Sequence, residues 1–519
     1  MIANVTTGAI IGIEGYKITV EVDICSSIPG FTIVGLPDMA VSEAKERIRS
    51  AIKNSGYSFP SKKIVINLAP ADIKKEGSGF DLPMAVGVLA ANGDINFESL
   101  EDVGFLGELS LDGSLRSVNG VLPITLGLKK AGIKKIIVPE INAKEAALVD
   151  GVEVYPVNDL QDVFKFLNPP AISEFRIQPF TIDVKEILEK TAEEEIQFDF
   201  KDVKGQEKAK RALEIAAAGG HNILMSGSPG SGKTLLAKCF AGILPPLEFS
   251  EAMELTKIYS VSGLLEKNQP LITSRPFRSP HHSASYAGII GGGTNPKPGE
   301  ISLAHRGVLF LDEVVEFPRQ VLEVLRQPLE DGVVTISRAA ISVKYPAEFT
   351  LLAAMNPCPC GYFGDKLKAC TCSEFQAKRY WSRLSGPILD RIDLQIEVSR
   401  LSEEELLSKN TNSESSKIIK ERVIKARKIQ VERFKNDGII SNSQISPKLI
   451  KKYCQLDSDG ENLLRMAISK FNLSGRAYDR ILKLSRTIAD LKDSENIKQI
   501  HIAEAIQYRN FDRMMLATV

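Results

Sequence analysis

The sequence lacks several features that would place it in a particular class of protein. No uninterrupted apolar run approaches the about 20 residues that a helix needs to span a bilayer, so we expect no membrane segment. The first residues carry no basic stretch followed by an apolar core, so we expect no signal peptide and a cytoplasmic protein. Lysine plus arginine and aspartate plus glutamate both number 65, so overall charge neither favours nor excludes a nucleic-acid partner.

Cysteine is also scarce, with seven in 519 residues, yet four fall within NPCPCGYFGDKLKACTCSE, residues 356–374. They form two Cys-x-Cys pairs separated by nine residues. In a reducing compartment such a group is expected to bind metal rather than to form disulfides. Four thiolates make a closed tetrahedral site that suits structural Zn²⁺, and an iron–sulfur cluster or a redox pair is the alternative. The predicted ligands are Cys358, Cys360, Cys370 and Cys372.

The first part of the chain, residues 1–168, alternates short β-rich runs with helical ones and predicts an α/β domain. Residues 18–24, 63–69 and 134–140 are expected to be strands. Residues 39–56 predict an amphipathic helix that ends at Gly56.

The rest of the chain divides by composition. Prolines followed by an acidic run predict a linker over 169–197. Residues 198–400 begin with a helix, a buried strand and a glycine-rich loop, which predicts a second α/β domain. Residues 401–519 are charged, with apolar residues at helical spacing, and predict a helical region.

A phosphate-binding loop is predicted over residues 227–234, because GSPGSGKT fits G-x-x-x-x-G-K-T between a buried strand and a helix. Its glycines let backbone N–H groups close around phosphates. Lys233 would reach the β- and γ-phosphates, and the Thr234 hydroxyl would bind Mg²⁺. The predicted nucleotide-binding residues are Gly227, Ser228, Pro229, Gly230, Ser231, Gly232, Lys233 and Thr234.

Two further buried strands end in polar residues. GVLFLDEV, residues 307–314, delivers Asp312, which would hold Mg²⁺, and Glu313, which would polarise the attacking water. FTLLAAMNP, residues 349–357, ends in Asn356, whose amide would position the same water.

Two arginine-bearing segments follow. Arg391 lies in a loop before a strand, from which it could reach the nucleotide of a neighbouring subunit. A local ion pair with Asp390 or Asp393 is the alternative. Arg476 and Arg480 open a later helix, and either is a candidate for the nucleotide or a simple surface cation.

Together these elements resemble an AAA+ ATPase, and more closely the magnesium chelatase-like ATPases of bacteria, the ComM/YifB family. The stretches that carry the resemblance are DVKGQEKAKRALEIAAAGGHNILMSGSPGSGKT, FRSPHHSASYAGIIGGGTNPKPGEISLAHRGVLFLDE, NPCPCGYFGD and GFTIVGLPD, so it covers essentially the whole chain. The resemblance implies ATP and Mg²⁺ as cofactors and a homo-hexameric ring. The implied fold is an α/β domain like that of Lon protease (ribosomal S5 domain 2-like), then an AAA+ core with a helical lid.

The same resemblance implies a role for each site residue. Lys233 and Thr234 are the Walker A pair, and Asp312 and Glu313 are the Walker B pair. The remaining residues, Asn356, Arg391 and Arg476, are sensor 1, the arginine finger and sensor 2, with Arg480 as the alternative for the last.

Two insertions in the expected ATPase core carry cations. Glycines and prolines around Lys297 predict a flexible exposed loop. Residues 330–349 predict a hairpin with Arg338 at its tip and Lys344 on the return strand. These three cations could grip DNA phosphates without reading bases. The alternative is that both insertions pack only on a neighbouring subunit.

The N-terminal domain resembles the proteolytic domain of Lon and the related domain of the recombination protein RadA. Lon-type peptidases use a Ser–Lys dyad. Here the nucleophile position falls on Gly79, beside Ser78, and the lysine position falls on Leu122. We therefore predict no peptidase activity.

The function expected from the sequence is an ATP-driven ring motor on single-stranded or branched DNA, acting by branch migration or unwinding in recombination of incoming strands. A chelatase-type ATPase that remodels a protein partner is the main alternative. An ATP-dependent protease is disfavoured by the missing lysine, and a nucleotide-gated binding module would follow if no ring forms.

Overall fold

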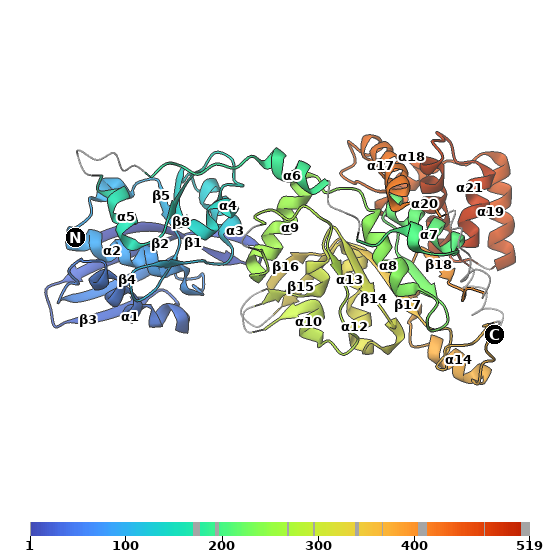
Figure 1. The fold of residues 1–519 in the computed structure, drawn as a ribbon, viewed down its shortest axis with the longest axis horizontal. Helices are drawn as coiled ribbons and strands as arrows, with labels where there is room; N and C mark the ends of the chain where they lie inside the picture. The colour runs from blue at the N-terminus through green and yellow to red at the C-terminus, as the bar shows by residue number, and fades with distance from the viewer. Residues whose placement is uncertain are drawn as a thin grey trace. The chain divides into compact units, whose positions relative to one another are not determined.

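The structure, a computed structural model, describes residues 2–169, 177–192, 197–266, 269–293, 296–337, 342–365, 367–402, 413–471 and 473–509 (Figure 1). The chain divides into two compact units. Unit 1 comprises residues 1–191 and 248–273, and unit 2 comprises residues 192–247 and 274–519.

Unit 1 is built on a seven-stranded mixed sheet in the order β3-β4-β2-β1-β5-β8-β9. Its centre is the antiparallel pair β1–β2, and β5, β8 and β9 continue in parallel. The strands are β1 (Ile2–Ile11), β2 (Glu14–Cys25), β3 (Gly30–Val34), β4 (Lys63–Ala69), β5 (Val103–Phe105), β8 (Lys135–Pro139) and β9 (Glu153–Val157). The predicted strands 18–24, 63–69 and 134–140 match β2, β4 and β8.

Helices cover this sheet and bury its apolar residues. They are α1 (Met39–Asn54), α2 (Asp81–Asn92), α3 (Val121–Lys130), α4 (Ala143–Ala146) and α5 (Leu160–Leu167). In α1, Asp38 caps the first turn by accepting a hydrogen bond from the Val41 N–H, and buried residues recur every three or four positions. The helix stops just before Gly56, whose φ of 88° is a left-handed conformation that favours glycine.

One segment predicted inside the ATPase core belongs to unit 1 instead. Residues 248–273, including α9 (Phe249–Ser262), follow the phosphate loop in sequence but pack on α3. Ser260 Oγ donates to the Glu145 carboxylate at 2.5 Å, and burial raises the pKa of that carboxyl. Residues 248–273 thus interrupt the predicted domain 198–400 and group with unit 1, because α9 packs on α3.

The predicted linker also has structure. Within 169–197, α6 (Val184–Ala192) is helical, and the Phe180 N–H donates to the Val154 carbonyl oxygen at the edge of the unit 1 sheet. Composition alone did not indicate this strand-edge contact.

Unit 2 contains a five-stranded parallel sheet in the order β11-β14-β17-β10-β18. The strands are β10 (Ile223–Ser226), β11 (Phe277–Arg278), β14 (Val308–Leu311), β17 (Thr350–Met355) and β18 (Leu394–Glu397). Nearly every residue of the three central strands is buried, as expected for a parallel sheet covered on both faces.

Helices and two hairpins complete unit 2. Its main helices are α7 (Glu207–Gly219), α8 (Lys233–Gly242), α10 (Tyr286–Ile290), α11 (Glu300–Leu303), α12 (Arg319–Val324), α13 (Arg326–Asp331), α14 (Glu374–Trp381) and α15 (Gly386–Leu389). The predicted helical region contains α17 (Ser416–Arg433), α18 (Pro447–Tyr453), α19 (Ser458–Phe471), α20 (Gly475–Leu491) and α21 (Gln499–Gln507), which share one core with the sheet. The hairpins are β12–β13 (Gly291–Gly292 and Lys297–Pro298) and β15–β16 (Val333–Ser337 and Ser342–Pro346).

The mixed α/β architecture with a parallel P-loop sheet confirms the predicted fold class. Within the described residues, no helix has the length and apolar character that crossing a membrane requires.

Candidate nucleotide site and metal centre

Three adjacent strands end together and form the centre of the site. Strands β14, β17 and β10 are parallel neighbours, so the residues that follow them meet at the carboxyl ends of these strands. These residues are Asp312, Asn356 and Gly227, and the Gly227 N–H donates to the Met355 carbonyl oxygen. The topology thus brings together the phosphate loop and the polar residues that the sequence predicted around it.

Lys233 is held by the loop that it serves. Its ammonium donates to the carbonyl oxygens of Gly227 (2.6 Å) and Ser228 (3.1 Å) and to Asn356 Oδ1 (3.3 Å). The side chain is only 9% exposed, and this burial lowers the pKa of Lys233. A buried cation next to N–H groups at the start of α8 is a suitable receptor for a phosphate chain, whose oxygens would replace the carbonyl acceptors.

A second contact joins the loop to the acidic strand end. Thr234 Oγ1 donates to Asp312 Oδ2 at 2.8 Å, and Asp312 Oδ1 accepts from the Glu313 N–H at 2.9 Å. A hydroxyl and a carboxylate are oxygen donors of the kind that Mg²⁺ prefers, so these two residues fit the predicted magnesium site. Bound Mg²⁺ would neutralise phosphate charge there.

Glu313 carries the exposed carboxylate of the site. Its backbone lies in the left-handed region with φ 49°, an uncommon conformation for this residue type. His282 Nδ1 lies 3.7 Å from Glu313 Oε2, and the His282 ring packs edge-on against Phe317. Sequence reasoning did not connect His282 with Glu313; the available signal was the histidine pair that follows the strand now seen as β11.

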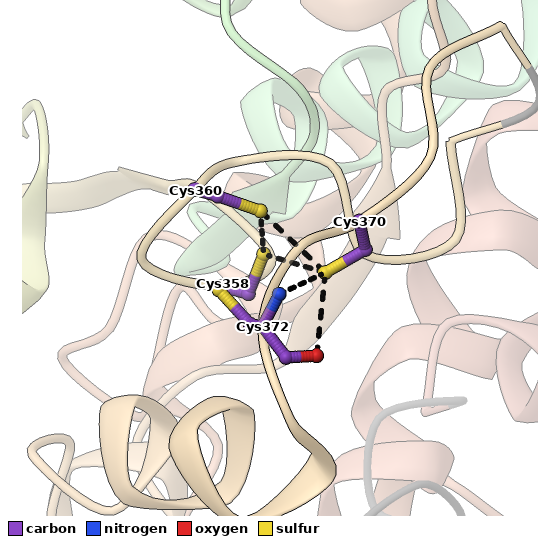
Figure 2. Close-up of side chains that lie close together, drawn as sticks. All are labelled: Cys358, Cys360, Cys370 and Cys372. Atoms are coloured by element: carbon purple, nitrogen blue, oxygen red, sulfur yellow. Dashed lines mark hydrogen bonds between the residues drawn. The ribbon is translucent and has the colours of Figure 1, made fainter.

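The four predicted metal ligands converge on one point (Figure 2). The sulfur atoms of Cys358, Cys360 and Cys370 lie 3.3 to 3.6 Å apart, and all four cysteine sulfurs lie within 4.8 Å of one another. These separations exceed a disulfide bond of about 2 Å and approach the about 3.8 Å between sulfurs around a tetrahedral zinc ion. The cluster therefore fits a thiophilic metal ion.

Backbone groups support the same arrangement. The Phe363 N–H donates to the Cys358 sulfur at 3.3 Å, and the Cys372 N–H donates to the Cys370 sulfur at 3.4 Å. Backbone N–H groups of Thr371 and Tyr362 lower the pKa of Cys360 to about 5. The Cys372 N–H lowers the pKa of Cys370, but burial and the sulfurs of Cys360 and Cys358 outweigh it and raise that pKa to about 12. Cys360 is therefore the ligand that the backbone favours most as a thiolate, the form of cysteine that binds metals.

The predicted arginines lie near the amino-terminal ends of the strands, at the other end of the sheet from the phosphate loop. Arg391 precedes β18, its carbonyl oxygen accepts from the Asn222 amide, and Asn222 in turn precedes β10. The phosphate loop follows the other end of β10, a four-residue strand that spans about 13 Å. Arg391 therefore faces away from the phosphate loop of its own chain.

Within the chain, Arg391 pairs with Glu330, and its side chain is 13% exposed. The sequence offered a local ion pair as the alternative to an arginine finger. Arg391 does form an ion pair, but with Glu330 and not with the expected Asp390 or Asp393. Arg476 lies in the same place, because its guanidinium donates to Asp390 at 3.0 Å. It too lies away from its own phosphate loop.

Arg476 and Arg480 differ in exposure. The Arg476 side chain is 64% exposed, whereas that of Arg480 is 13% exposed and donates to the carbonyl oxygens of Leu389 and Ile392. Of the two candidates in α20, Arg480 is held by main-chain carbonyl oxygens, and Arg476 is the more exposed to solvent.

The two insertions adjoin each other in unit 2. Tyr345 on β16 donates its hydroxyl to the carbonyl oxygen of Pro296, next to β13, and a Cβ at Gly291 on β12 would lie 2.9 Å from Ile336 on β15. Lys297 and Lys344 are both exposed on these hairpins. Arg338, predicted at the hairpin tip, lies outside the described residues.

Comparison with known proteins agrees with this geometry. Three family models match: "Magnesium chelatase, subunit ChlI" over residues 199–406, "Subunit ChlI of Mg-chelatase" over 20–142 and "Magnesium chelatase, subunit ChlI C-terminal" over 413–509. The chain is 45% identical to the competence protein ComM of Haemophilus influenzae over 514 residues, which cover 99% of this chain and 98% of that protein. It is 44% identical to YifB of Escherichia coli over 513 residues, with the same coverage of both.

The chain belongs to the ComM/YifB family of magnesium chelatase-like AAA+ proteins. Membership implies ATPase activity with ATP and Mg²⁺, in agreement with the phosphate loop and with the Thr234–Asp312 contact.

The likeness of this ComM/YifB-type chain to a Lon protease covers about a quarter of the chain. Lon protease 2 of Bacillus subtilis is 30% identical over 143 residues, 27% of this chain and 24% of that protein. Ser78 donates to the Glu108 carboxylate, and Leu122 is fully buried in the position where a dyad lysine is expected. This pair of positions therefore presents no Ser–Lys dyad, and the absence of peptidase activity stays a prediction.

Proposed function

We propose that this protein is an ATP-hydrolysing ring motor that acts on single-stranded or branched DNA, by branch migration or unwinding, during recombination of incoming strands. The observation that carries the proposal is the pair of adjoining hairpins with exposed Lys297 and Lys344 on the unit that holds the ATP site. Lysines on a projecting hairpin bind phosphates without sequence preference. The name of the Haemophilus relative, a competence protein, supports a role with incoming DNA.

The proposal of a ring is based on the positions of Arg391 and Arg476. A nucleotide bound at Lys233 needs a cation to stabilise charge at the γ-phosphate. Arg391 and Arg476 both lie at the end of the sheet opposite to their own phosphate loop. If they serve a nucleotide, it is that of the next copy of the chain, and head-to-tail contacts of this kind close into rings. We propose a homo-hexamer in which Arg391 must leave Glu330 to act.

The four-cysteine cluster is proposed to hold structural Zn²⁺. Four cysteine ligands leave no open position for a reacting water, so the ion would stabilise its loop rather than take part in hydrolysis. The separations between the sulfur atoms and the N–H groups directed at them support this assignment over a disulfide.

The test is the steady-state ATPase rate of the purified protein without DNA and with single strands, duplex or a four-way junction. We expect stimulation that is greatest on the junction and absent in Lys233→Ala. Lys297→Ala and Lys344→Ala should lose stimulation and keep the basal rate. Lys428→Ala removes an exposed lysine from α17 instead and serves as the matched control. A Lys233-dependent rate that is indifferent to every DNA would refute the DNA motor.

That last outcome would favour the second candidate, a chelatase-type remodelling ATPase with a protein partner. The match to the 38 kDa magnesium-chelatase subunit of Cereibacter sphaeroides supports it, at 24% identity over 177 residues. This likeness covers only 31% of the chain.

A further inference from the structure

The loop that contains the four cysteines, residues 358–372 and here called the cysteine loop, contacts the phosphate loop directly. Ser228 Oγ, in the phosphate loop, donates to Asp365 Oδ2 at 2.5 Å. Asp365 lies between the two Cys-x-Cys pairs, so this hydrogen bond joins the cysteine loop to the nucleotide site.

Asp365 is itself fixed by the cysteine loop. Its second oxygen, Oδ1, accepts from the backbone N–H groups of Leu367 (2.7 Å) and Lys368 (3.1 Å). One carboxylate oxygen thus holds the cysteine loop and the other holds Ser228. Because a carboxylate repels phosphate, Asp365 is suited to positioning the phosphate loop and not to binding the nucleotide.

A second contact lies beside the first. Gly361 adopts φ 85°, and a Cβ there would lie 2.6 Å from Pro229 Cδ and 2.7 Å from Pro229 Cγ. Backbone and proline ring are therefore in close contact, and the Gly361 N–H donates to the Cys358 carbonyl oxygen. The residues that touch Ser228 and Pro229 both belong to the segment that the four sulfurs enclose.

Among the described residues of the cysteine loop, few other side-chain contacts hold it in place; in one of them the Lys368 ammonium lies 4.1 Å from the centroid of the Tyr362 ring. The large apolar side chains of the loop, Phe363 and Leu367, are 43% and 62% exposed, so they form no core. At its start, Trp381 Nε1 donates to the Pro357 carbonyl oxygen at 2.8 Å, but this bond fixes the base of the loop and not its far part. The position of Asp365 therefore depends on the cysteine cluster.

We propose that metal occupancy of the four-cysteine site sets the affinity of this protein for ATP, with Asp365 as the positioning residue that transmits the effect. The inference rests on the proposed metal site. With the metal bound, Asp365 and Gly361 hold Ser228 and Pro229, and the backbone of the phosphate loop is preorganised for phosphates. Without it, that backbone must be ordered when ATP binds. Linkage requires the reverse effect as well, so bound ATP should tighten the binding of the metal.

The experiment measures the Kd of a fluorescent ATP analogue with Mg²⁺, and separately the Zn²⁺ content by mass spectrometry. Asp365→Ala should keep its zinc and bind the analogue about tenfold more weakly, as expected for loss of a hydrogen bond to a charged group. Asp365→Asn can keep its amide oxygen on the Leu367 and Lys368 N–H groups and donate its NH₂ to Ser228 Oγ, so it should recover most of the affinity. Glu374→Ala, which removes an exposed acid just beyond the cysteines, is the matched control.

Removal of the metal from the whole protein with a zinc-selective chelator, followed by measurement in Mg²⁺, should weaken binding by at least the same factor. The further loss in Asp365→Ala should be smaller, because only the Gly361–Pro229 contact remains to be lost there. At equilibrium with a chromophoric chelator, the original protein should retain more Zn²⁺ when the ATP analogue is bound, and this difference should be much smaller in Asp365→Ala. Unchanged affinity in both the Asp365→Ala and the metal-stripped protein would overturn the proposal, as would purified protein without metal. None of these readings uses DNA, so they are independent of the proposed motor function.

Discussion

Lys233 and Asn356, which are 123 positions apart in the chain, meet at the carboxyl end of the parallel sheet, where the ammonium donates to the amide oxygen at 3.3 Å. The contact links the phosphate loop to the end of β17. A γ-phosphate bound by Lys233 would therefore lie next to Asn356, and the water that attacks it would lie between Asn356 and the Glu313 carboxylate. Asn356 and Glu313 are thus expected to act on hydrolysis more than on binding.

Replacement of Glu313 by glutamine should stop hydrolysis and leave ATP binding intact. The amide keeps the size of the side chain but cannot polarise the attacking water, so kcat should fall by about 100-fold or more. Single-turnover hydrolysis and nucleotide retention on a desalting column would measure this. Asp312→Asn, which alters the magnesium-binding oxygens, should weaken Mg²⁺-dependent binding as well. Normal hydrolysis by Glu313→Gln would contradict the assignment.

Arg391 is predicted to act on the nucleotide of a neighbouring copy. Arg391→Ala should lower kcat by about 10³-fold while ATP binding persists. Mixing it with Lys233→Ala, also inactive alone, should recover part of the activity, because a mixed ring contains sites that pair an intact Lys233 with an intact Arg391. Steady-state rates across mixing ratios would show this.

The competing explanation for Arg391 is a purely structural ion pair with Glu330. In that case Arg391→Ala and Glu330→Ala should lower the melting temperature alike, and mixing should restore nothing. Glu330 is 63% exposed, so solvent screens the pair and it is worth about 1 kcal/mol. A large loss of kcat with an unchanged melting temperature would therefore exclude a purely structural role.

The ATP site was predictable from the sequence because its residues follow buried strands. Apolar runs such as 308–311 predict parallel strands, and the residue after each run must lie at one edge of the sheet. The cysteine cluster was predictable for a similar reason, since its ligands are close in sequence. Local patterns of this kind contain the information that places Lys233, Asp312 and Asn356 together.

Contacts set by packing between distant segments were not predictable. Nothing in residues 248–273 shows that α9 packs on α3, because an apolar helix face does not specify its partner. The same holds for Asp365 and Ser228, and for the shared location of Arg391 and Arg476. These contacts depend on where each loop lies at the ends of the strands. The order of elements in the chain does not determine those positions.

The cysteine cluster should contain one zinc ion per chain. Cys370→Ser removes one ligand and should release the metal and lower the melting temperature of unit 2, because metal binding supplies folding free energy to its loop. Metal analysis and differential scanning calorimetry would measure both effects. Cys25→Ser, at an exposed cysteine of unit 1, should change neither. An iron–sulfur cluster would instead give a visible absorption band and iron in the metal analysis.

His282 is predicted to hold the Glu313 carboxylate in place. Its Nδ1 lies 3.7 Å from Glu313 Oε2, and a small rotation of the exposed glutamate would bring them within hydrogen-bond distance. His282→Ala should lower kcat about tenfold with little change in the Kd for ATP, since Lys233 and Thr234 keep their contacts.

The conservative variant separates positioning from packing at His282. His282→Asn retains an N–H donor but lacks most of the ring that packs against Phe317. If His282 orients Glu313, asparagine should restore most of kcat; if it only fills space, asparagine and alanine should be equally impaired and equally destabilised. In Glu313→Gln protein, His282→Ala should cause no further loss, because the group that it orients is already inactive. An additional loss in that double variant would show that His282 acts elsewhere in the site.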